Sequence, residues 1–295
     1  MLADAGPAAG LGHLSRCTAL AVALRCHGRE VRTLAYGAVE STVVGDVRWD
    51  PLPEGEEPFR GEGAPVVLDS YRLPAAAAGA LAAGGPLVAF HDPGQPAPPR
   101  GAMVISFAAE GPVWAAGARY ACLRPEFWGL DQPRRGGEGP LRRALVAAGS
   151  GVLGGAGGVA AAVADALPGV EVRLVAGPYA TEPVPSGVVP VHAPDGLRDE
   201  LRAADLVVSA AGQTMLEALC AGTPCVAFAH ADNQRGQLEM LAQAGAVAAT
   251  QPERLAGLVA ELAAAGDRRA ALSEHGRATI DGFGALRLAA RMTAP

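Results

Sequence analysis

A histidine follows a glycine-rich turn near the start of the chain, in the segment Gly10–Cys17 (GLGHLSRC). Glycines let a backbone approach an anion closely, and the N-terminus of a helix adds favourable dipole charge. Histidine titrates near neutral pH, so His13 could accept a proton from a reacting group. The helix start also disfavours the imidazolium, so we expect His13 to be neutral. A histidine that only caps or packs the helix is the alternative.

Two carboxylates come directly after short apolar segments, where parallel strands are expected to end. One segment runs through Asp69 to Tyr71 (VLDSY), and the other ends in His91 and Asp92 (FHD). Ligands of open parallel sheets bind beyond the carboxyl ends of the strands. Either Asp69 or Asp92 could therefore orient His13 or a water molecule. The alternative for Asp69 is an ordinary turn capped by an aspartate.

A second glycine-containing junction, Ser209–Glu217 (SAAGQTMLE), joins an apolar segment to an expected helix. Free amides at such a helix start can hold a diphosphate. Glu217 lies one turn into the helix, within reach of a ribose diol. The alternative is a tight strand–helix junction with a solvated Glu217. The expected nucleotide contacts at this junction are Ala211, Gly212, Gln213 and Thr214.

Asn233, the one asparagine of the chain, follows another expected strand in the segment Ala229–Gln234 (AHADNQ). Its amide could donate to a sugar hydroxyl, it could cap the next helix, or it could do both.

Several motifs are missing from the chain. It has no lysine, which excludes Schiff-base chemistry and the P-loop lysine. It also lacks D-x-D, H-E-x-x-H and G-x-S-x-G patterns. These absences do not favour a metal-held diphosphate, a zinc hydrolase or a serine hydrolase.

The elements that must position these residues alternate between short apolar strands and helices, which is typical of parallel α/β layers. Residues 1–4 are short for a buried first strand, and a helix is expected at residues 14–26. Further strands are expected at residues 31–35, 65–68, 87–90, 103–106, 119–123, 144–147, 170–175, 188–191, 206–209 and 224–229. Further helices are expected at residues 195–203, 213–221, 234–244, 252–264 and 285–291.

Length and composition favour two folded domains. The chain has 295 residues, of which 50% are hydrophobic and 18% charged, so it is not a disordered chain. Its net charge of −6 disfavours a nucleic-acid partner. Five cysteines without a C-x-x-C pair, and a start without a signal-peptide pattern, predict a cytoplasmic protein. No stable membrane association is expected, because glycines interrupt the uncharged run at residues 144–164.

With these residues assembled, the chain resembles the UDP-2,4-diacetamido-2,4,6-trideoxy-β-L-altropyranose hydrolases of pseudaminic acid biosynthesis, which are grouped with spore-coat polysaccharide proteins. The family has a Gly-Gly-Ser-Asp loop where residues 148–151 (AGSG) lack the acid, and it usually has paired acids where this chain has His91 and Asp92. The resemblance rests on Asp4–Gly6, Gly10–His13, Arg16, Cys17, Leu68–Tyr71, Asp92, Tyr120–Phe127, Ala210–Thr214, Glu217, Asn233 and Gln234.

The resemblance implies a GT-B fold, an α/β architecture in which two Rossmann-like domains face a cleft. Residues 1–130 would form the domain with the catalytic histidine, and residues 140–295 the nucleotide-binding domain, with a last helix that can cross back. His13 would be the base, Tyr71 and Asn233 would line the sugar site, and Glu217 would bind the ribose. The implied substrate contacts are Gly12, Arg16, Asp69, Tyr71, Asp92, Asn233 and Gln234. The implied nucleotide contacts are Gly149, Ser150, Ala211, Gly212, Gln213, Thr214 and Glu217.

The implied activity is hydrolysis of a UDP-activated deoxyamino sugar, by attack of water with inversion, without metal or cofactor. A diphosphate is a good leaving group, so the carboxylate pair of glycosidases is not needed. One alternative is a GT-B glycosyltransferase that moves the sugar to an alcohol. The other is a nucleotide-sugar-binding protein without turnover. The oligomeric state is left open.

Overall fold

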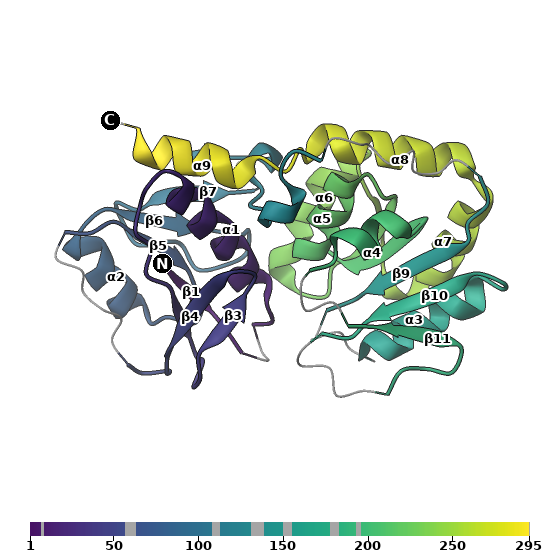
Figure 1. The fold of residues 1–295 in the computed structure, drawn as a ribbon, viewed down its shortest axis with the longest axis horizontal. Coiled ribbons are helices and arrows are strands. Elements are labelled where there is room, and N and C mark those ends of the chain that lie inside the picture. Colours follow the sequence, from purple (N-terminus) through teal and green to yellow (C-terminus); the bar gives the residue numbers. More distant parts are fainter. Residues whose placement is uncertain are drawn as a thin grey trace. The chain divides into compact units, whose positions relative to one another are not determined.

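The computed structural model describes residues 1–6, 9–56, 63–107, 113–130, 139–149, 155–177, 183–192 and 196–294 (Figure 1). The chain divides into two compact units. Unit 1 comprises Met1–Pro125 and Phe283–Pro295, and unit 2 comprises Glu126–Gly282. Residues 126–130, which were expected in the first domain, group with the second unit, and the last helix, which was expected to be able to cross back, groups with the first.

The sheet of unit 1 has the strand order β3-β4-β2-β1-β5-β6-β7-β8, and only the β3–β4 pair among these is antiparallel. The carboxyl ends of β1, β5 and β6 therefore lie side by side in the middle of this sheet. The strands are β1 (Leu2–Asp4), β2 (Leu34–Tyr36), β3 (Thr42–Val44), β4 (Val47–Leu52), β5 (Val66–Asp69), β6 (Leu87–Phe90), β7 (Met103–Ser106) and β8 (Ala115–Ala116).

Helix α1 (Gly12–Cys26) buries one face, with Leu14, Cys17 and Leu20 fully covered. Helix α9 (Gly284–Thr293) packs against α1 (Figure 1). A Cβ on Gly284 would lie 2.1 Å from the carbonyl oxygen of Ala121, so this close approach requires glycine. Helix α2 (Ala75–Gly84) completes the α-helices described in this unit.

The sheet of unit 2 is parallel, with the order β11-β10-β9-β12-β13-β14. Its central strands are mainly apolar and almost entirely buried, as expected of a sheet covered on both faces. The strands are β9 (Arg143–Ala147), β10 (Glu171–Val175), β11 (Val188–Val191), β12 (Leu206–Ala210), β13 (Cys225–Phe228) and β14 (Ala248–Thr250). The helices are α3 (Gly155–Ala166), α4 (Arg198–Ala203), α5 (Gln213–Ala221), α6 (Arg235–Gln243), α7 (Leu255–Ala264) and α8 (Gly266–Thr279).

The prediction of a strand at residues 119–123 is wrong. Gly117, with φ +89°, turns the chain into a 3-10 helix at Ala118–Tyr120 instead. The apolar residues that suggested a strand, Cys122 and Leu123, are buried without joining the sheet. The strand expected at residues 31–35 begins at Leu34. Strands β3, β4, β8 and β14 and helices α2 and α8 were not predicted.

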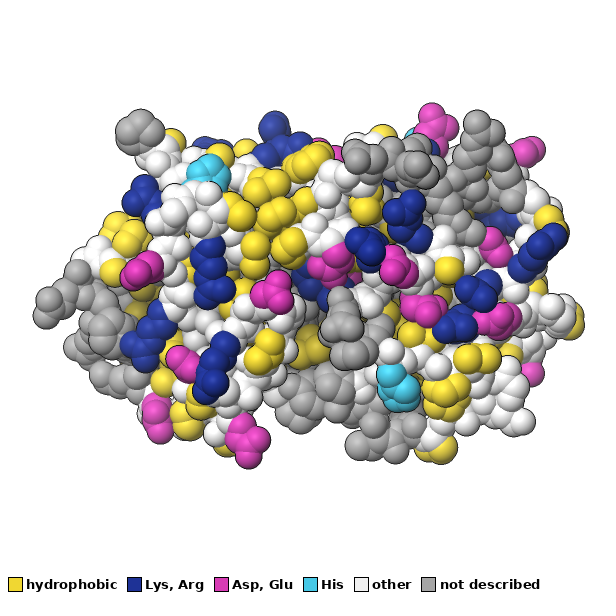
Figure 2. All heavy atoms as spheres, viewed as in Figure 1, with side chains coloured by type: hydrophobic (Ala, Val, Ile, Leu, Met, Phe, Trp, Pro, Cys, Tyr) yellow, Lys and Arg dark blue, Asp and Glu magenta, His cyan; other side chains and the backbone are white. Residues whose placement is uncertain are grey.

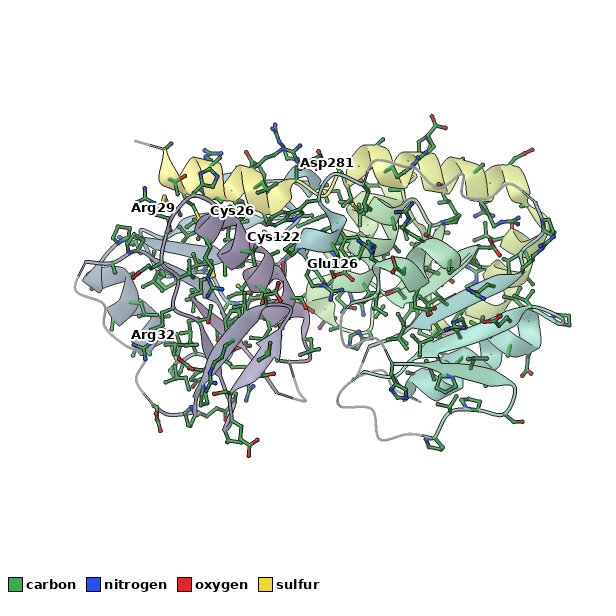
Figure 3. The ribbon with its side chains drawn as sticks, in the orientation of Figure 1. Cys26, Arg29, Arg32, Cys122, Glu126 and Asp281 are labelled. Atoms are coloured by element: carbon green, nitrogen blue, oxygen red, sulfur yellow. The ribbon has the colours of Figure 1, made fainter. Side chains whose placement is uncertain are left out.

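No helix in the described ranges is both long and apolar enough to cross a bilayer. The uncharged run at residues 144–164 contributes most of β9 and of α3, and residues 150–154 lie outside the described residues. In the described part of the face that Figure 2 shows, cationic and anionic side chains are interspersed. The five cysteines are free thiols, and Figure 3 labels Cys26 and Cys122 in unit 1.

Candidate functional site

A buried pair between a histidine and an aspartate lies at the carboxyl end of β5 in unit 1. His13 Nδ1 is 2.7 Å from Asp69 Oδ1, and the two side chains are 13% and 0% exposed. An ionised carboxylate can only accept hydrogen bonds, so Nδ1 carries the proton. The lone pair of a neutral His13 is therefore on Nε2. Such a pair holds one tautomer of the ring and leaves the other nitrogen to act as a base.

The surrounding charges decide the protonation of both partners. Burial raises the pKa of Asp69, but the charges of Arg16 and His13 and their hydrogen bonds lower it by more, so that the pKa lies well below its usual value. Burial lowers the pKa of His13, but the charge of Asp69 and its hydrogen bond raise it more, to above the ordinary 6.5. The direction of this shift is opposite to the one expected from the helix start. A nearby full negative charge outweighs the partial charge of a helix end.

Arg16, one turn after His13 on α1, joins two carboxylates. Its Nε and Nη2 donate to Asp69 Oδ2 and Oδ1, each at 2.6 Å. Its Nη1 donates to both oxygens of Asp92 at 3.1 Å. Nη2 also donates to the Tyr71 hydroxyl at 3.3 Å, and the guanidinium lies 4.9 Å from the centre of the Phe90 ring. Arg16 thus links the segments that follow β5 and β6.

Tyr71 supports both Asp92 and His13. Its hydroxyl donates to Asp92 Oδ2 at 2.6 Å and accepts from the Asp92 amide at 3.1 Å. Its ring meets the His13 ring edge-on, with centroids 5.2 Å apart. Burial, the strongest influence, and the neighbouring carboxylates hold the pKa of Tyr71 well above its usual value, so the hydroxyl is neutral.

Three further residues complete this site, although no role in it was predicted for them. Asp4 accepts from the Ser70 hydroxyl at 2.5 Å and from the Tyr71 amide at 2.9 Å. Ser70 Oγ in turn accepts from the Leu73 amide at 2.9 Å. Asp4 and Ser70 therefore cap this turn, and the interpretation of Asp69 as its cap is wrong. Cys17 Sγ donates to Asp69 Oδ2 at 3.6 Å, and burial raises the pKa of this thiol well above its usual value.

Gly12 is the first residue of α1, and a Cβ there would meet no atom within 4 Å. Open space thus lies beside the backbone just before His13. The implied substrate contacts of unit 1 lie together: Gly12, Arg16, Asp69, Tyr71 and Asp92.

The candidate nucleotide site of unit 2 is built from a strand–helix junction. Helix α5 begins after Gly212, which has no side chain to cap the first amides. Ala211 precedes it, and Gln213 and Thr214 form the start of the helix. The first amides of a nine-residue helix thus remain uncapped by a side chain at the carboxyl end of β12.

The segment after β13 lies beside this junction. Gln234 Oε1 accepts from the His230 amide at 3.1 Å, and Gln234 Nε2 would lie 3.8 Å from a Cβ on Gly212. Gln237 Nε2 donates to the carbonyl oxygen of Ala211 at 3.3 Å. The two loops that end neighbouring strands are therefore tied together, as expected for a site at the edge of a parallel sheet.

Two of the alternative interpretations of residues in unit 2 are wrong, those of Glu217 and Asn233. Glu217 is 2% exposed, so it is not a solvated side chain at a tight junction. Helix α6 begins after Gln234 and has no side-chain cap, so Asn233 does not cap it. Gly149 follows β9 by two residues, with φ +82°, and a Cβ added there would meet no atom within 4 Å. Ser150 lies outside the described residues.

Known proteins resemble the chain in structure. *Acinetobacter baumannii* MurG is 17% identical over 98% of this chain and 97% of that one, with a TM-score of 0.60. Spinosyn rhamnosyltransferase SpnG in complex with thymidine diphosphate is 18% identical over 97% and 98%, with a TM-score of 0.63. Glycosyltransferase SnogD from *Streptomyces nogalater* is 19% identical over 98% of both chains, with a TM-score of 0.53. Neither a family model nor a curated protein sequence matches the chain.

The chain has a GT-B fold. This confirms the predicted α/β class with two parallel-dominated sheets. Sequence identity below one fifth shows the fold alone, so the chemistry must be argued from the residues of the two sites.

Proposed function

We propose that this protein hydrolyses a UDP-activated deoxyamino sugar, releasing UDP and the free sugar with inversion at the anomeric carbon. The observation that carries the proposal is the His13–Asp69 pair at the start of α1, in a chain with a GT-B fold. The sequence motifs shared with UDP-sugar hydrolases favour water as the nucleophile.

In this reaction His13 Nε2 accepts a proton from water as the oxygen attacks the anomeric carbon. Asp69 keeps the proton of the ring on Nδ1 and stabilises the imidazolium that forms. This use of a buried carboxylate behind a histidine base follows the logic of catalytic triads. Attack from the side opposite the diphosphate inverts the configuration at carbon.

Unit 2 would hold the leaving group. The uncapped amides at the start of α5 and the helix dipole stabilise the charge that grows on the diphosphate. In this assignment Glu217 binds the ribose, and Asn233 and Gln234 contact the sugar. No metal is assigned to the reaction, because hydrogen bonds from backbone amides can stabilise the negative charge of the diphosphate.

The test is incubation of the purified full chain with a panel of UDP-sugars, without and with alcohols. We expect free UDP and free sugar in equal amounts without an alcohol, and proton NMR at early times should show the inverted anomer. Retention of configuration would overturn the mechanism. If UDP binds but none of the donors is turned over, the protein is a nucleotide-sugar-binding protein without turnover.

A glycosyltransferase is the second candidate. SpnG, which shares the fold, is described as a rhamnosyltransferase in complexes with thymidine diphosphate and with spinosyn aglycone. The same base would then deprotonate an alcohol instead of water. Product that appears only with an alcohol, as a glycoside, would replace the hydrolase proposal.

A further inference from the structure

The guanidinium of Arg16 donates from all three of its nitrogens to groups of unit 1. Nε donates to Asp69, Nη2 donates to Asp69 and Tyr71, and Nη1 donates to the two oxygens of Asp92. These bonds direct the guanidinium toward the two carboxylates, and the Arg16 side chain is only 18% exposed.

The Tyr71 hydroxyl is also engaged by groups of unit 1. It donates its one hydrogen to Asp92 Oδ2, and it accepts from the Asp92 amide and from Arg16 Nη2. A hydroxyl can donate once and accept twice, so no capacity remains. Arg16, Tyr71 and Asp92 thus form a closed network behind His13, rather than a row of groups that point toward a ligand.

We propose that Arg16 is a positioning residue: it fixes the Asp69 carboxylate against His13 and supplies the positive charge that limits the attraction of that carboxylate for a protonated ring. This role rests on the proposed function of His13 as a base. It differs from the direct substrate contact that the family resemblance implies for Arg16.

The physical reason lies in the competition for Asp69. His13 and Arg16 Nη2 share Oδ1, and Arg16 Nε occupies Oδ2. A buried carboxylate with one histidine as its only cationic partner strongly favours the imidazolium. Arg16 lowers the pKa of His13 and so opposes the increase due to Asp69. The base therefore has a pKa above 6.5 but can still lose its proton when the pH rises.

Titratable and charged groups face His13 from each element packed against it. Asp69 and Tyr71 come from β5 and the following turn, and Tyr71 stays neutral. The remaining groups are Asp4 from β1, Arg16 and Cys17 from α1, and Asp92 after β6. Arg16 is the arginine that contacts both Asp69 and Asp92, so its removal leaves these carboxylates without that counter-charge beside the ring.

The decisive experiment is an NMR titration of His13 in the full chain without any substrate, with the signal assigned by its loss in His13→Asn. In Arg16→Gln we expect the pKa of His13 to rise by about one unit or more. In Arg16→Lys, which keeps the charge, we expect less than about half of that change. In Arg29→Gln, a matched change at an exposed arginine after α1 (Figure 3), the pKa should not move.

A second variant, Asp92→Asn, keeps the proposal testable if Arg16→Gln does not fold. Asp92→Asn keeps the shape of the side chain but removes a negative charge that now offsets Arg16. The pKa of His13 should then fall by roughly 0.5–1 unit, opposite in sign to Arg16→Gln. A merely structural role of Arg16 predicts no such pair of opposite shifts. An unchanged or lower pKa in Arg16→Gln, or an unchanged or higher one in Asp92→Asn, would overturn the proposal.

The titration separates this inference from the proposed function, because it uses no substrate. If UDP-sugars are turned over, the acid limb of the profile of kcat/KM against pH for Arg16→Gln should move upward by the same amount as the pKa, since kcat/KM reports the free enzyme. If no UDP-sugar is turned over but the two shifts appear, the function fails and the role of Arg16 in setting the basicity of His13 stands. If UDP-sugars are turned over but the two shifts are absent, the proposed function stands and the role of Arg16 in setting the basicity of His13 fails.

Discussion

The candidate sites of the two units are held together in different ways. In unit 1, side chains from β1, α1 and the ends of β5 and β6 meet in a buried network of charges, with Asp69 fully covered. In unit 2, the candidate site is mainly backbone: the uncapped start of α5, supported by amide side chains of Gln234 and Gln237. Unit 1 is therefore suited to moving a proton, and unit 2 to holding a fixed negative charge.

This difference predicts different sensitivities. A buried charge network responds strongly to the loss of one partner, because the others are left without compensation. A backbone site loses only single hydrogen bonds when a side chain is changed. Substitutions in unit 1 should thus change rate, stability and pH dependence, whereas substitutions in unit 2 should change mainly nucleotide affinity.

The largest effect is expected for His13→Asn. Loss of a general base lowers kcat by roughly 10²–10⁴, while the affinity for UDP should change little because the nucleotide is assigned to unit 2. Steady-state kinetics and calorimetry measure the two quantities. The exposed His27→Asn, at the end of the same helix, is the control and should keep the parental kcat. Full activity in His13→Asn would remove the base from the mechanism.

Asp69→Asn tests the network through stability. Removing one partner of a buried charge pair costs about 3–5 kcal/mol of unfolding free energy, because Arg16 then lacks its main counter-ion. The matched change Asp50→Asn breaks an exposed pair with Arg48 and should cost less than about 1 kcal/mol. Urea denaturation of both variants at pH 7 gives the comparison. Equal losses would show that the network does not stabilise unit 1.

The sequence predicted those parts of the sites that are local. His13 at a helix start and Gly212 at a strand–helix junction are visible within a few residues, and the structure places both as expected. The contacts of Arg16 with Asp69 and Asp92 join residues 53 and 76 positions apart. Spacing along the chain cannot predict such contacts. The sequence therefore indicates the effect of the helix start on the pKa of His13, but it does not show the larger effect of the Asp69 carboxylate.

One missed element did carry a signal. Strands β3 and β4 pair Val44 with Val47 across Gly45 and Asp46, and Gly45 has φ +57°. A Gly-Asp pair between β-branched residues is typical of a two-residue hairpin. The strand wrongly predicted at residues 119–123 failed for another reason: its apolar residues are buried by packing rather than by strand pairing.

Glu217→Ala tests the nucleotide site. Losing hydrogen bonds to a partly buried partner should weaken UDP binding by about 1–3 kcal/mol in calorimetry without added metal. The exposed Glu239→Ala on α6 is the control and should bind UDP as the parent does. Circular dichroism must show that Glu217→Ala is folded, since this side chain is buried. Unchanged affinity, or an absolute need for Mg²⁺, would contradict the assignment of UDP to this junction.

The raised pKa of His13 gives activity and stability opposite pH dependences. The base must be neutral, so kcat/KM, which reports the free enzyme, should rise about tenfold per unit of pH below its pKa, with a midpoint above 6.5. The stability that comes from protonated His13 is fully present below its unfolded pKa and is lost as pH rises through the folded value. Values of kcat/KM and urea denaturation between pH 5.5 and 8.5 test both trends. His13→Asn should abolish this part of the stability change, and a midpoint of kcat/KM below 6.5 would contradict the raised pKa.

The smallest effect is expected for Asn233→Asp. Asn233 is half-buried beside Gln234, and it does not cap α6. The change keeps the shape of the side chain but replaces an amide donor with a carboxylate. If the amide donates to a sugar hydroxyl, kcat/KM should fall about 2- to 10-fold, the value of one hydrogen bond, while UDP alone binds as before. Asp232→Asn, at the neighbouring exposed position, makes the reverse change in charge and should leave kcat/KM unchanged. Normal turnover in Asn233→Asp would remove this residue from the sugar site and leave Gln234 as the sugar contact assigned to unit 2.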